Sequence, residues 1–380
     1  LLPNKSSQLG PGMAWGDVDG DGDDDTFIGG SAGFEGQLFL NQGNGQFKNA
    51  LQSCFTYDVR SEDMGSLFID YDLDGDLDLY VVSGGVECEP GDAVLRDRLY
   101  INDGIGNFEK GSSDLLPDIR SSGSVVVAAD INGDKRLELF IGGRIIPGKY
   151  PESPRSYVLR YTGSKYEDVT DIFAPEIKQL GMVTSALFTD VDGDHRPDLL
   201  VTYEWGPVRY FYNEGGKLID RTSQSGLADR QGWYNSISGG DIDNDGDTDY
   251  LVGNFGLNTK YEATITKPEI MYYGDFEGNG KKRIIEAKYE NGLFFPHRGL
   301  GCSSDAMPMV KQNLPTYHQF AITSLQGIYT ESLLNNAEKF EANNLASGVL
   351  INQTDDQGKV RFEFQPLPRI AQASPIFGSA

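Results

Sequence analysis

Cysteine, histidine and basic residues are scarce in this chain of 380 residues. It holds 3 cysteines and 3 histidines, and 32 Lys and Arg residues stand against 57 Asp and Glu residues, which gives a formal net charge of −25. Phosphate backbones and anionic lipid surfaces repel so acidic a chain, and we therefore expect no nucleic-acid partner. Since no run of about 18 apolar residues occurs, we also expect no membrane-spanning helix.

Recognisable catalytic motifs are missing as well. The sequence has no HExxH or P-loop motif, and His195, His297 and His318 lie in three unrelated contexts. These absences favour a protein without enzymatic activity. Aromatic residues make up 11% of the chain and supply material for a core, which excludes a disordered acidic chain.

Glycine is abundant, with 47 residues, and one acidic pattern recurs six times. The nine-residue segments have Asp, Asn or Glu at alternate positions around a glycine-rich turn, and they begin at Asp17, Asp70, Asp130, Asp190, Asp241 and Asp275. Apart from the last, they start roughly 50 to 60 residues apart, which is the length of a supersecondary unit. Short strand-like runs flank each segment, four per unit, and this is the pattern of a β-propeller blade.

The repeat predicts an all-β fold with a single propeller domain over residues 1–380. We expect blades at about 10–60, 61–118, 119–175, 176–228, 229–267 and 268–370. A helical pattern over 299–345, with a capping box at 316–319, predicts two helices inserted in the sixth blade. Residues 371–380 resemble a first strand. Either the ring closes on six blades plus terminal strands, or, as we favour, this strand begins a seventh blade of a longer protein.

The acidic segments have the ligand chemistry of calcium. Carboxylates at positions one, three, five and nine, with a backbone carbonyl at position seven, offer the all-oxygen ligation that Ca²⁺ prefers. Transition metals would require His or Cys, which these segments lack apart from His195. The predicted ligands of four sites are Asp17, Asp19, Asp21, Asp23 and Asp25; Asp70, Asp72, Asp74, Asp76 and Asp78; Asp190, Asp192, Asp194, Arg196 and Asp198; and Asp241, Asp243, Asp245, Asp247 and Asp249. Asp23, Asp76, Arg196 and Asp247 would bind through their backbone carbonyls.

Two segments depart from the pattern. The third has Asp130, Asn132, Asp134, Arg136 and Glu138, a weaker ligand set that would raise the count from four calcium ions to five. In the sixth, Arg283 occupies the position of the closing carboxylate, and we expect its guanidinium to take the place of a metal ion. Bound cations would remove the repulsion among the carboxylates and fix each turn between two strands, so their predicted role is structural.

These loops and their flanking strands resemble the FG-GAP or VCBS repeat family, whose calcium-binding blades also occur in integrin α-subunit propellers. More narrowly, segments 2–10, 97–104, 253–259 and 302–308 resemble bacterial proteins related to cartilage acidic protein, which carry an ASPIC/UnbV module. The resemblance implies a propeller of the seven-bladed type whose last blade is incomplete here. It also implies a secreted or cell-surface location, as one part of a longer exported chain.

An exported protein permits a disulfide, and Cys54 and Cys88, which lie in connections around the first two blades, are the candidate pair. Free buried thiols are the alternative. Millimolar extracellular calcium is also consistent with the affinity of such modules.

Two functional classes remain open from the sequence. The first is a non-enzymatic recognition or scaffold domain, monomeric in itself, whose loops contact a protein or a carbohydrate. The second is a polysaccharide lyase or hydrolase built on a propeller. The aromatic residues Trp205, Trp233, Tyr234 and Phe255 either form a binding face or pack in the blade core. Segment 144–155, which is basic and rich in proline, is expected to protrude as a loop.

Overall fold

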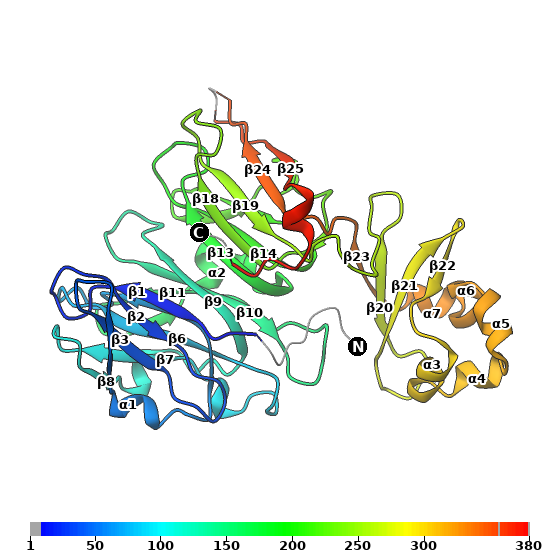
Figure 1. Ribbon diagram of the computed structural model, residues 1–380, viewed down its shortest axis with the longest axis horizontal. Helices are drawn as coiled ribbons and strands as arrows, with labels where there is room; N and C mark the ends of the chain where they lie inside the picture. Colours follow the sequence, from blue (N-terminus) through cyan, green and yellow to red (C-terminus); the bar gives the residue numbers. More distant parts are fainter. Residues whose placement is uncertain (1–8, 356–357, 379–380) are drawn as a thin grey trace.

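The computed structural model describes residues 9–355 and 358–378. Residues 1–8, 356–357 and 379–380 lie outside this description, and with them most of the segment 2–10 and the end of 371–380. The described chain is all-β, with six antiparallel sheets and few helices (Figure 1). The prediction of an all-β fold made of four-stranded units is confirmed.

The first three sheets each contain four strands that are consecutive in the chain. Their strands are β1 (Met13–Gly16), β2 (Asp25–Ile28), β3 (Gln37–Asn41) and β4 (Phe47–Ala50); β5 (Glu62–Ile69), β6 (Asp78–Gly84), β7 (Arg98–Asn102) and β8 (Phe108–Lys110); and β9 (Ser122–Ala129), β10 (Glu138–Ile145), β11 (Tyr157–Tyr161) and β12 (Tyr166–Asp168). Short helices α1 (Ser53–Thr56) and α2 (Thr170–Phe173) follow the first and third sheets. Every acidic segment lies between the first and second strands of its sheet.

The fourth sheet repeats this order and gains one extra strand. It contains β13 (Met182–Thr189), β14 (Asp198–Gly206), β15 (Arg209–Glu214) and β16 (Lys217–Asp220), and the two-residue β17 (Gly232–Trp233) also pairs with β14.

The fifth sheet differs from the prediction. Its strands are β18 (Ser236–Gly240), β19 (Asp249–Gly253), β24 (Gly348–Asn352) and β25 (Phe362–Pro366). The prediction that 348–352 and 362–366 belong to a sixth blade is wrong, because β24 pairs with β19, with Tyr250 opposite Leu350. The predicted boundary at residue 267 therefore falls inside an insertion between two neighbouring strands of one sheet.

The insertion forms a unit with its own sheet. Strands β20 (Glu269–Gly274), β21 (Arg283–Glu290), β22 (Leu293–Pro296) and β23 (Glu338–Ala342) pair in the order β22-β21-β20-β23. Five short helices replace the two expected ones: α3 (Leu300–Ala306), α4 (Met309–Asn313), α5 (Tyr317–Ile322), α6 (Leu325–Tyr329) and α7 (Glu331–Asn335). The side chains of Thr316, Ser324 and Thr330 cap the N-termini of the last three and so divide the helical stretch.

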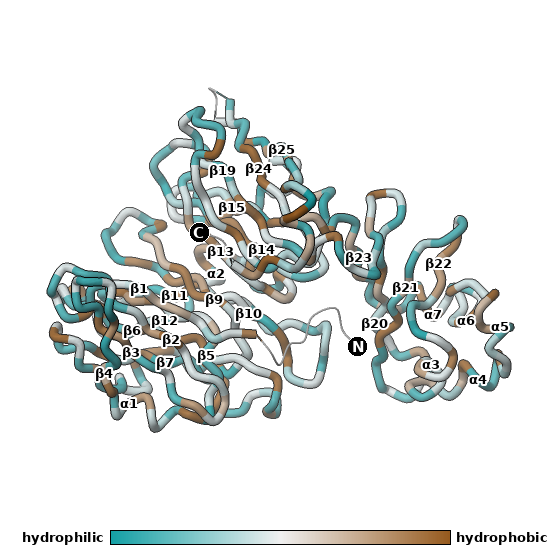
Figure 2. Tube along the Cα trace, in the orientation of Figure 1, coloured by the Kyte–Doolittle hydropathy of each residue, from teal (hydrophilic) through white to brown (hydrophobic). Residues whose placement is uncertain are grey.

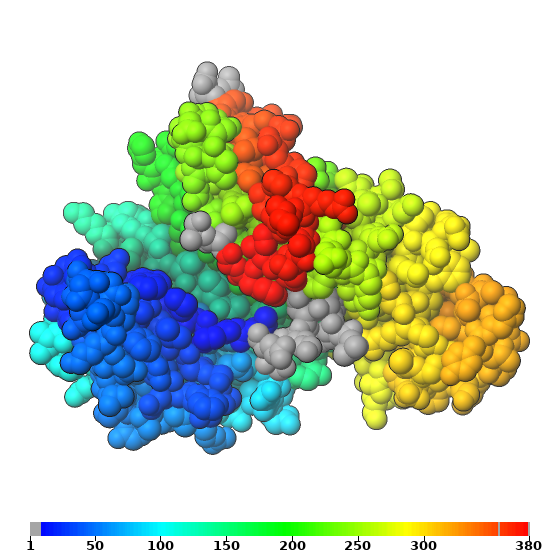
Figure 3. Space-filling view, in the orientation of Figure 1, coloured from blue at the N-terminus to red at the C-terminus, as the bar shows by residue number. Residues whose placement is uncertain are grey.

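The first strands of the five consecutive sheets neighbour one another in chain order: β1 contacts β5, β5 contacts β9, β9 contacts β13 and β13 contacts β18. A Cβ atom on Gly65 of β5 would lie 2.9 Å from the Cα atom of Val125 in β9, which shows how closely these strands converge. The sheets thus form an arc consistent with propeller-like blades (Figure 1). The inserted unit, yellow to orange in Figure 3, extends from the side of this arc, where β23 contacts β14.

Apolar side chains fill the seams between consecutive sheets. On β10, Leu139 and Ile141 pack with residues of the second sheet, and Phe140 packs with residues of the fourth. Since successive side chains of a strand point to opposite faces, a strand in the middle of the arc is buried on both sides. The apolar stretches are visible along β9, β10 and β14 in Figure 2.

Residues 371–378 form no strand in the part of the chain that is described. The Ile376 amide donates instead to the Asn254 carbonyl at the end of β19, at 3.1 Å. The expected first strand of a seventh blade is thus replaced by an irregular segment that lies against the fifth sheet.

The three cysteines are free, so the expected Cys54–Cys88 disulfide is wrong. Cys54 is buried in the seam between the first and second sheets, against an apolar cluster that includes Phe55. Cys88 follows β6, and burial, together with the nearby carboxylates of Asp92 and Glu62, raises the pKa of its thiol. The two thiols belong to different environments, and the alternative of free thiols holds.

An asparagine at the end of the third strand joins each of three sheets to the sheet before it. The side-chain amide of Asn102 donates to the Val18 carbonyl at 2.7 Å, that of Asn213 to Ile131 at 2.9 Å, and that of Asn352 to Val191 at 2.8 Å. Each accepting carbonyl is at the second position of the preceding acidic loop. We call these contacts the seam asparagines.

The third sheet has an aromatic contact in the same place. Tyr161 stands at the end of β11, where the other sheets have asparagine, and its ring packs edge-on against Tyr71, the second residue of the second acidic loop, with the centroids 5.5 Å apart. Val18, Ile131 and Val191 are nearly inaccessible, whereas Ile242, their counterpart in the fifth loop, is 49% exposed because no described sheet covers it.

We expect Asn213→Ala to lower the free energy of unfolding by about 2 kcal/mol, because it leaves the buried carbonyls of Ile131 and Pro197 without their donor. Urea unfolding followed by tryptophan fluorescence measures the change. Asn49→Ala is the matched control, since Asn49 is exposed and makes a single 3.4 Å contact with Gln37. Equal losses in the two variants would contradict the structural role of the seam asparagines.

Candidate metal centres in the acidic loops

Four acidic loops bring three carboxylates together. In each group the candidate ligand oxygens all lie within 4.8 Å of one another. The groups are Asp17, Asp19 and Asp25; Asp70, Asp72 and Asp78; Asp190, Asp192 and Asp194; and Asp241, Asp243 and Asp249. Three convergent carboxylate oxygens fit a hard divalent cation that takes six to eight oxygen ligands, the remainder coming from backbone and water.

The first aspartate folds each loop around its own carboxylate. Asp17 Oδ1 accepts from the Gly20 and Asp21 amides at 2.8 and 3.1 Å, and its Oδ2 accepts from Gly22 at 2.9 Å. This wrapping requires positive φ angles at positions four and six, which Gly20 and Gly22 adopt at 75° and 94°. In the fourth loop the sixth position is His195, which adopts φ 67° despite its side chain.

The carboxylate at position nine closes the loop from inside the sheet. Asp25 is fully buried and accepts from the Val18 amide at 3.0 Å and from the Asn41 amide of β3 at 2.8 Å. Burial raises the pKa of the equivalent Asp78 and Asp198 to about 7, against several backbone donors that lower it. An ionised carboxylate at this depth, close to two others, is costly unless a cation accompanies it.

The fifth-position aspartates of three loops lie outside these groups. The carboxylates of Asp21, Asp74 and Asp245 accept the backbone amides of residues Asp23, Asp76 and Asp247 at 2.9 to 3.0 Å. Three of the predicted ligand sets are thus brought together at positions one, three and nine, and the fourth at positions one, three and five.

The third loop has an internal cation that sequence reasoning missed. The Arg160 guanidinium, from β11, pairs with Asp134 and lies 3.5 Å from Glu138 Oε1. Asn132 turns its amide to the same Glu138 oxygen at 2.5 Å. The register of β10 and β11 sets Arg160 opposite Glu138, and this brings the guanidinium to the loop. The contact could have been predicted only from knowledge of which residues of the two strands face each other.

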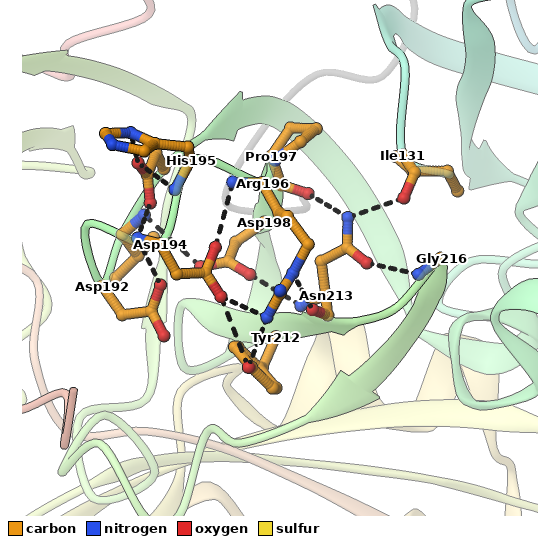
Figure 4. A network of polar contacts seen from close by, with 12 residues as sticks. Ile131, Asp192, Asp194, His195, Arg196, Pro197, Asp198, Tyr212, Asn213 and Gly216 are labelled. Atoms are coloured by element: carbon orange, nitrogen blue, oxygen red, sulfur yellow. Dashed lines mark hydrogen bonds and ion pairs between the residues drawn. The ribbon is translucent and has the colours of Figure 1, made fainter. Parts of the chain in front are cut away.

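The fourth loop has both a group of three carboxylates and an arginine that pairs with one of them (Figure 4). Asp194 belongs to its carboxylate group, yet it also pairs with the Arg196 guanidinium, which donates to Tyr212 Oη at 2.8 Å. The expected ligand Asp198 lies outside the group and accepts from the Asn213 amide at 2.6 Å and from Tyr210 Oη at 3.1 Å. This loop therefore offers a cation fewer free carboxylate oxygens than the other three do.

The sixth loop folds around Asp275 in the same way, with the Gly280 amide at 2.7 Å from Oδ2. Arg283 does not fill it as expected. Its Nε donates to the Ala306 carbonyl at 3.2 Å, and no described contact joins its guanidinium to the loop carboxylates.

The aromatic residues considered as a binding face pack in the core. Trp233 and Tyr234 are almost fully buried, and Trp205 is packed edge-on against Trp233 at 5.0 Å. Segment 144–155 does not protrude either, since Tyr150 Oη accepts from Trp205 Nε1 at 2.7 Å and Glu152 contacts Tyr273 of the inserted sheet at 2.9 Å. The packing of the inserted unit covers this segment.

Four-stranded antiparallel sheets, each with an acidic loop between its first two strands, define an all-β repeat protein. The model of the FG-GAP-like repeat matches residues 17–81, 70–141 and 155–252, more than half of the chain. The chain belongs to the FG-GAP-like repeat family, and the predicted resemblance to that family is confirmed. The first two matches begin at an acidic loop, which shows that the loops are part of what defines the repeat.

No curated protein matches the chain. Among solved structures, the chain is similar to the biofilm matrix protein Bap1 of V. cholerae, at 12% identity and a TM-score of 0.33 over 95% of this chain and 67% of that one. It is also similar to an α-L-arabinofuranosidase from Lactobacillus brevis, at 11% identity and a TM-score of 0.36 over 76% and 93% of the two chains. These scores are too low to support an argument about function. In the described residues, no helix has the length and apolar character needed to cross a bilayer.

We expect Arg160→Gln to lower the free energy of unfolding by about 1 kcal/mol or more, because the buried Glu138 loses its nearest charged partner. Thermal melting in the presence of a chelator measures the loss, and addition of calcium tests whether the emptied loop now takes a cation. Arg155→Gln is the control, since Arg155 pairs with Asp168 in the same sheet and Asp168, unlike Glu138, is partly exposed. A melting temperature as high as that of the control would show that Arg160 has no such role.

Proposed function

We propose that this chain is a calcium-stabilised extracellular domain that recognises a protein or a glycan without catalysing a reaction. The observation that supports it best is the repetition of three convergent carboxylates at the same place in four sheets. A site built for chemistry occurs once, whereas a structural site recurs with its structural unit. The four groups would hold about four calcium ions, and Arg160 serves the third loop instead.

Calcium would stabilise the seams as well as the loops. In the first and fourth loops the second residue gives its carbonyl to the next sheet, so a cation that holds these loops also fixes the acceptor of a seam asparagine. A calcium ion that binds only to the folded chain stabilises the fold by mass action. The gain is about 4 kcal/mol per site when the calcium concentration is a thousand times the dissociation constant. Millimolar extracellular calcium provides that excess, which is why we place the domain outside the cytoplasm, in an exported chain related to proteins with an ASPIC/UnbV module.

We expect removal of calcium to lower the melting temperature by about 10 °C or more, and restored calcium to reverse the change. Scanning calorimetry is run with chelator, with chelator saturated by calcium, and with magnesium in place of calcium. The second condition shows whether the chelator itself changes the melting temperature, and the third shows whether magnesium can replace calcium. Asp70→Asn with Asp72→Asn should remove part of the effect and one bound ion, while Asp103→Asn, an exposed turn residue, should remove neither. A melting curve unchanged after complete metal removal would contradict the proposal.

The second candidate is a polysaccharide-active enzyme. It is favoured by two buried acid–base pairs in the inserted unit, Glu269 with His297 and Glu286 with Arg298, at 2.5 and 3.2 Å. Release of reducing ends or of unsaturated products from polysaccharides by the calcium-loaded chain would establish this class and contradict a purely recognitional role.

A further inference from the structure

A cavity of about 290 Å³ lies where the fourth and fifth sheets meet, beside the fourth acidic loop. The loop, β15, the segment after β16 and the residues before β25 line it, and among the lining residues are Asp192, Tyr210, Tyr212, Arg221, Gln224 and Lys359. Figure 4 labels two of these residues, Asp192 and Tyr212. The deeper wall is buried, since Tyr210, Ser225 and Val360 are 2, 1 and 9% exposed. We call this space the seam cavity.

At the first seam a side chain occupies the corresponding place. Gln52, which follows β4, accepts from the Phe108 amide at the start of β8, at 3.0 Å. At the fourth seam the amide of Phe362, at the start of β25, donates instead to the backbone carbonyl of Ser225, at 3.0 Å. The backbone after β16 thus makes the contact that the Gln52 side chain makes in the first seam, and the space of that side chain is left to the seam cavity.

Two basic side chains line the seam cavity without an ion pair in the described part of the chain: Arg221 and Lys359. The guanidinium carbon of Arg221 lies 5.9 Å from the centre of the Tyr212 ring. Asp355 accepts the backbone amide of Lys359 at 3.0 Å, not its ammonium group. In a chain with 57 acidic and 32 basic residues, two unpaired cations on one cavity form a place that attracts an anion.

Asp192 is the one acidic residue among the described residues that line the seam cavity. It belongs to the carboxylate group of the fourth loop, so the cation proposed for that group would offset its charge. The two basic residues outnumber this acid whether or not the ion is bound. The remaining carboxylates of the loop would repel a ligand with several closely spaced charges, and this favours a ligand with a single anionic group at the cavity.

The uncharged lining residues narrow the ligand further. The partly exposed ring of Tyr212 offers a flat apolar surface, and Gln224 and Ser225 offer neutral hydrogen-bonding groups. The volume is at the lower end of the range for small-molecule sites, so it suits about one sugar ring. A sugar ring with one carboxylate or sulfate combines an apolar C–H face, hydroxyls and a single anionic group, and so matches all three kinds of lining residue.

We propose that the seam cavity binds an acidic saccharide unit, whose single carboxylate or sulfate group pairs with Arg221 and Lys359 while its ring packs on Tyr212. This inference rests on the proposed recognition function, to which it gives a ligand class and a place. The fourth acidic loop would then serve twice, because it stabilises its sheet and forms one wall of the recognition site.

Isothermal titration calorimetry of the calcium-loaded chain tests the ligand class with two pairs of probes. Trigalacturonate is compared with neutral galactotriose, and sulfated lactose with lactose, so that the members of a pair differ mainly in their anionic groups. We expect at least one acidic probe to bind with 1:1 stoichiometry and its neutral counterpart to bind about tenfold more weakly or not at all. The acidic probe that binds more tightly shows whether carboxylate or sulfate is the group recognised.

Three variants test the place of binding. Arg221→Gln should weaken binding about tenfold, because it removes a charged donor of several hydrogen bonds. Lys359→Gln should weaken it about threefold, because an exposed ion pair contributes less, and this exposed residue guards against a folding defect in the first variant. Lys217→Gln is the matched control, since Lys217 is an exposed lysine of β16 outside the cavity, and it should leave binding unchanged.

Two results would overturn the assignment: neither acidic probe binds at millimolar concentration, or one binds equally well to Arg221→Gln, to Lys359→Gln and to the unchanged chain. Tighter binding of an aspartate tripeptide than of either acidic probe would overturn the saccharide class and would leave the proposed recognition of a protein standing. These results are independent of the melting experiment with chelator, so a failure of this site and a failure of the calcium-stabilised scaffold are told apart.

Discussion

The crowding of carboxylates where two sheets meet is the constraint on which the rest of this structure depends. In each acidic loop the first aspartate folds the backbone around itself, and in four loops the last aspartate is buried where it accepts a backbone amide of the third strand of its sheet. In the first, third and fourth loops the second residue also gives its carbonyl to an asparagine of the next sheet. One short segment thus sets the turn, the pairing within the sheet and the contact to its neighbour, and all three require that its negative charge be offset.

The loops meet this requirement in more than one way. Three offer an open group of carboxylates to a cation, the third loop receives the Arg160 guanidinium from a neighbouring strand, and the fourth shares Asp194 between its group and Arg196. Between the second and third sheets, the packing of Tyr71 against Tyr161 likewise replaces the asparagine contact. The strand and loop geometry of the repeat is thus the same in each sheet, while the interactions that stabilise it differ. This is expected, because the fold requires only that each buried charge is neutralised and each buried carbonyl accepts a hydrogen bond.

The inserted unit follows a different principle. It is inserted between β19 and β24, which are neighbours in the fifth sheet, and it attaches to the fourth sheet where Met271 and Tyr261 pack against Trp205 and Trp233. Its buried acids Glu269 and Glu286 are paired with His297 and Arg298. The insertion is thus held to the arc of repeats by apolar packing rather than by an acidic loop.

The sequence by itself determined the all-β class, the four-strand repeat, the family and the candidate calcium loops, because each depends on spacing within about ten residues and recurs several times. It also indicated a helical insertion. Only the tertiary structure decided that strands 348–352 and 362–366 complete the fifth sheet, that Cys54 and Cys88 remain apart, and that Arg160 reaches Glu138. It decided as well that His297 and Glu269, unrelated in the chain, form a pair. These contacts join residues through strand register and sheet packing, and a single sequence carries no local signal for either.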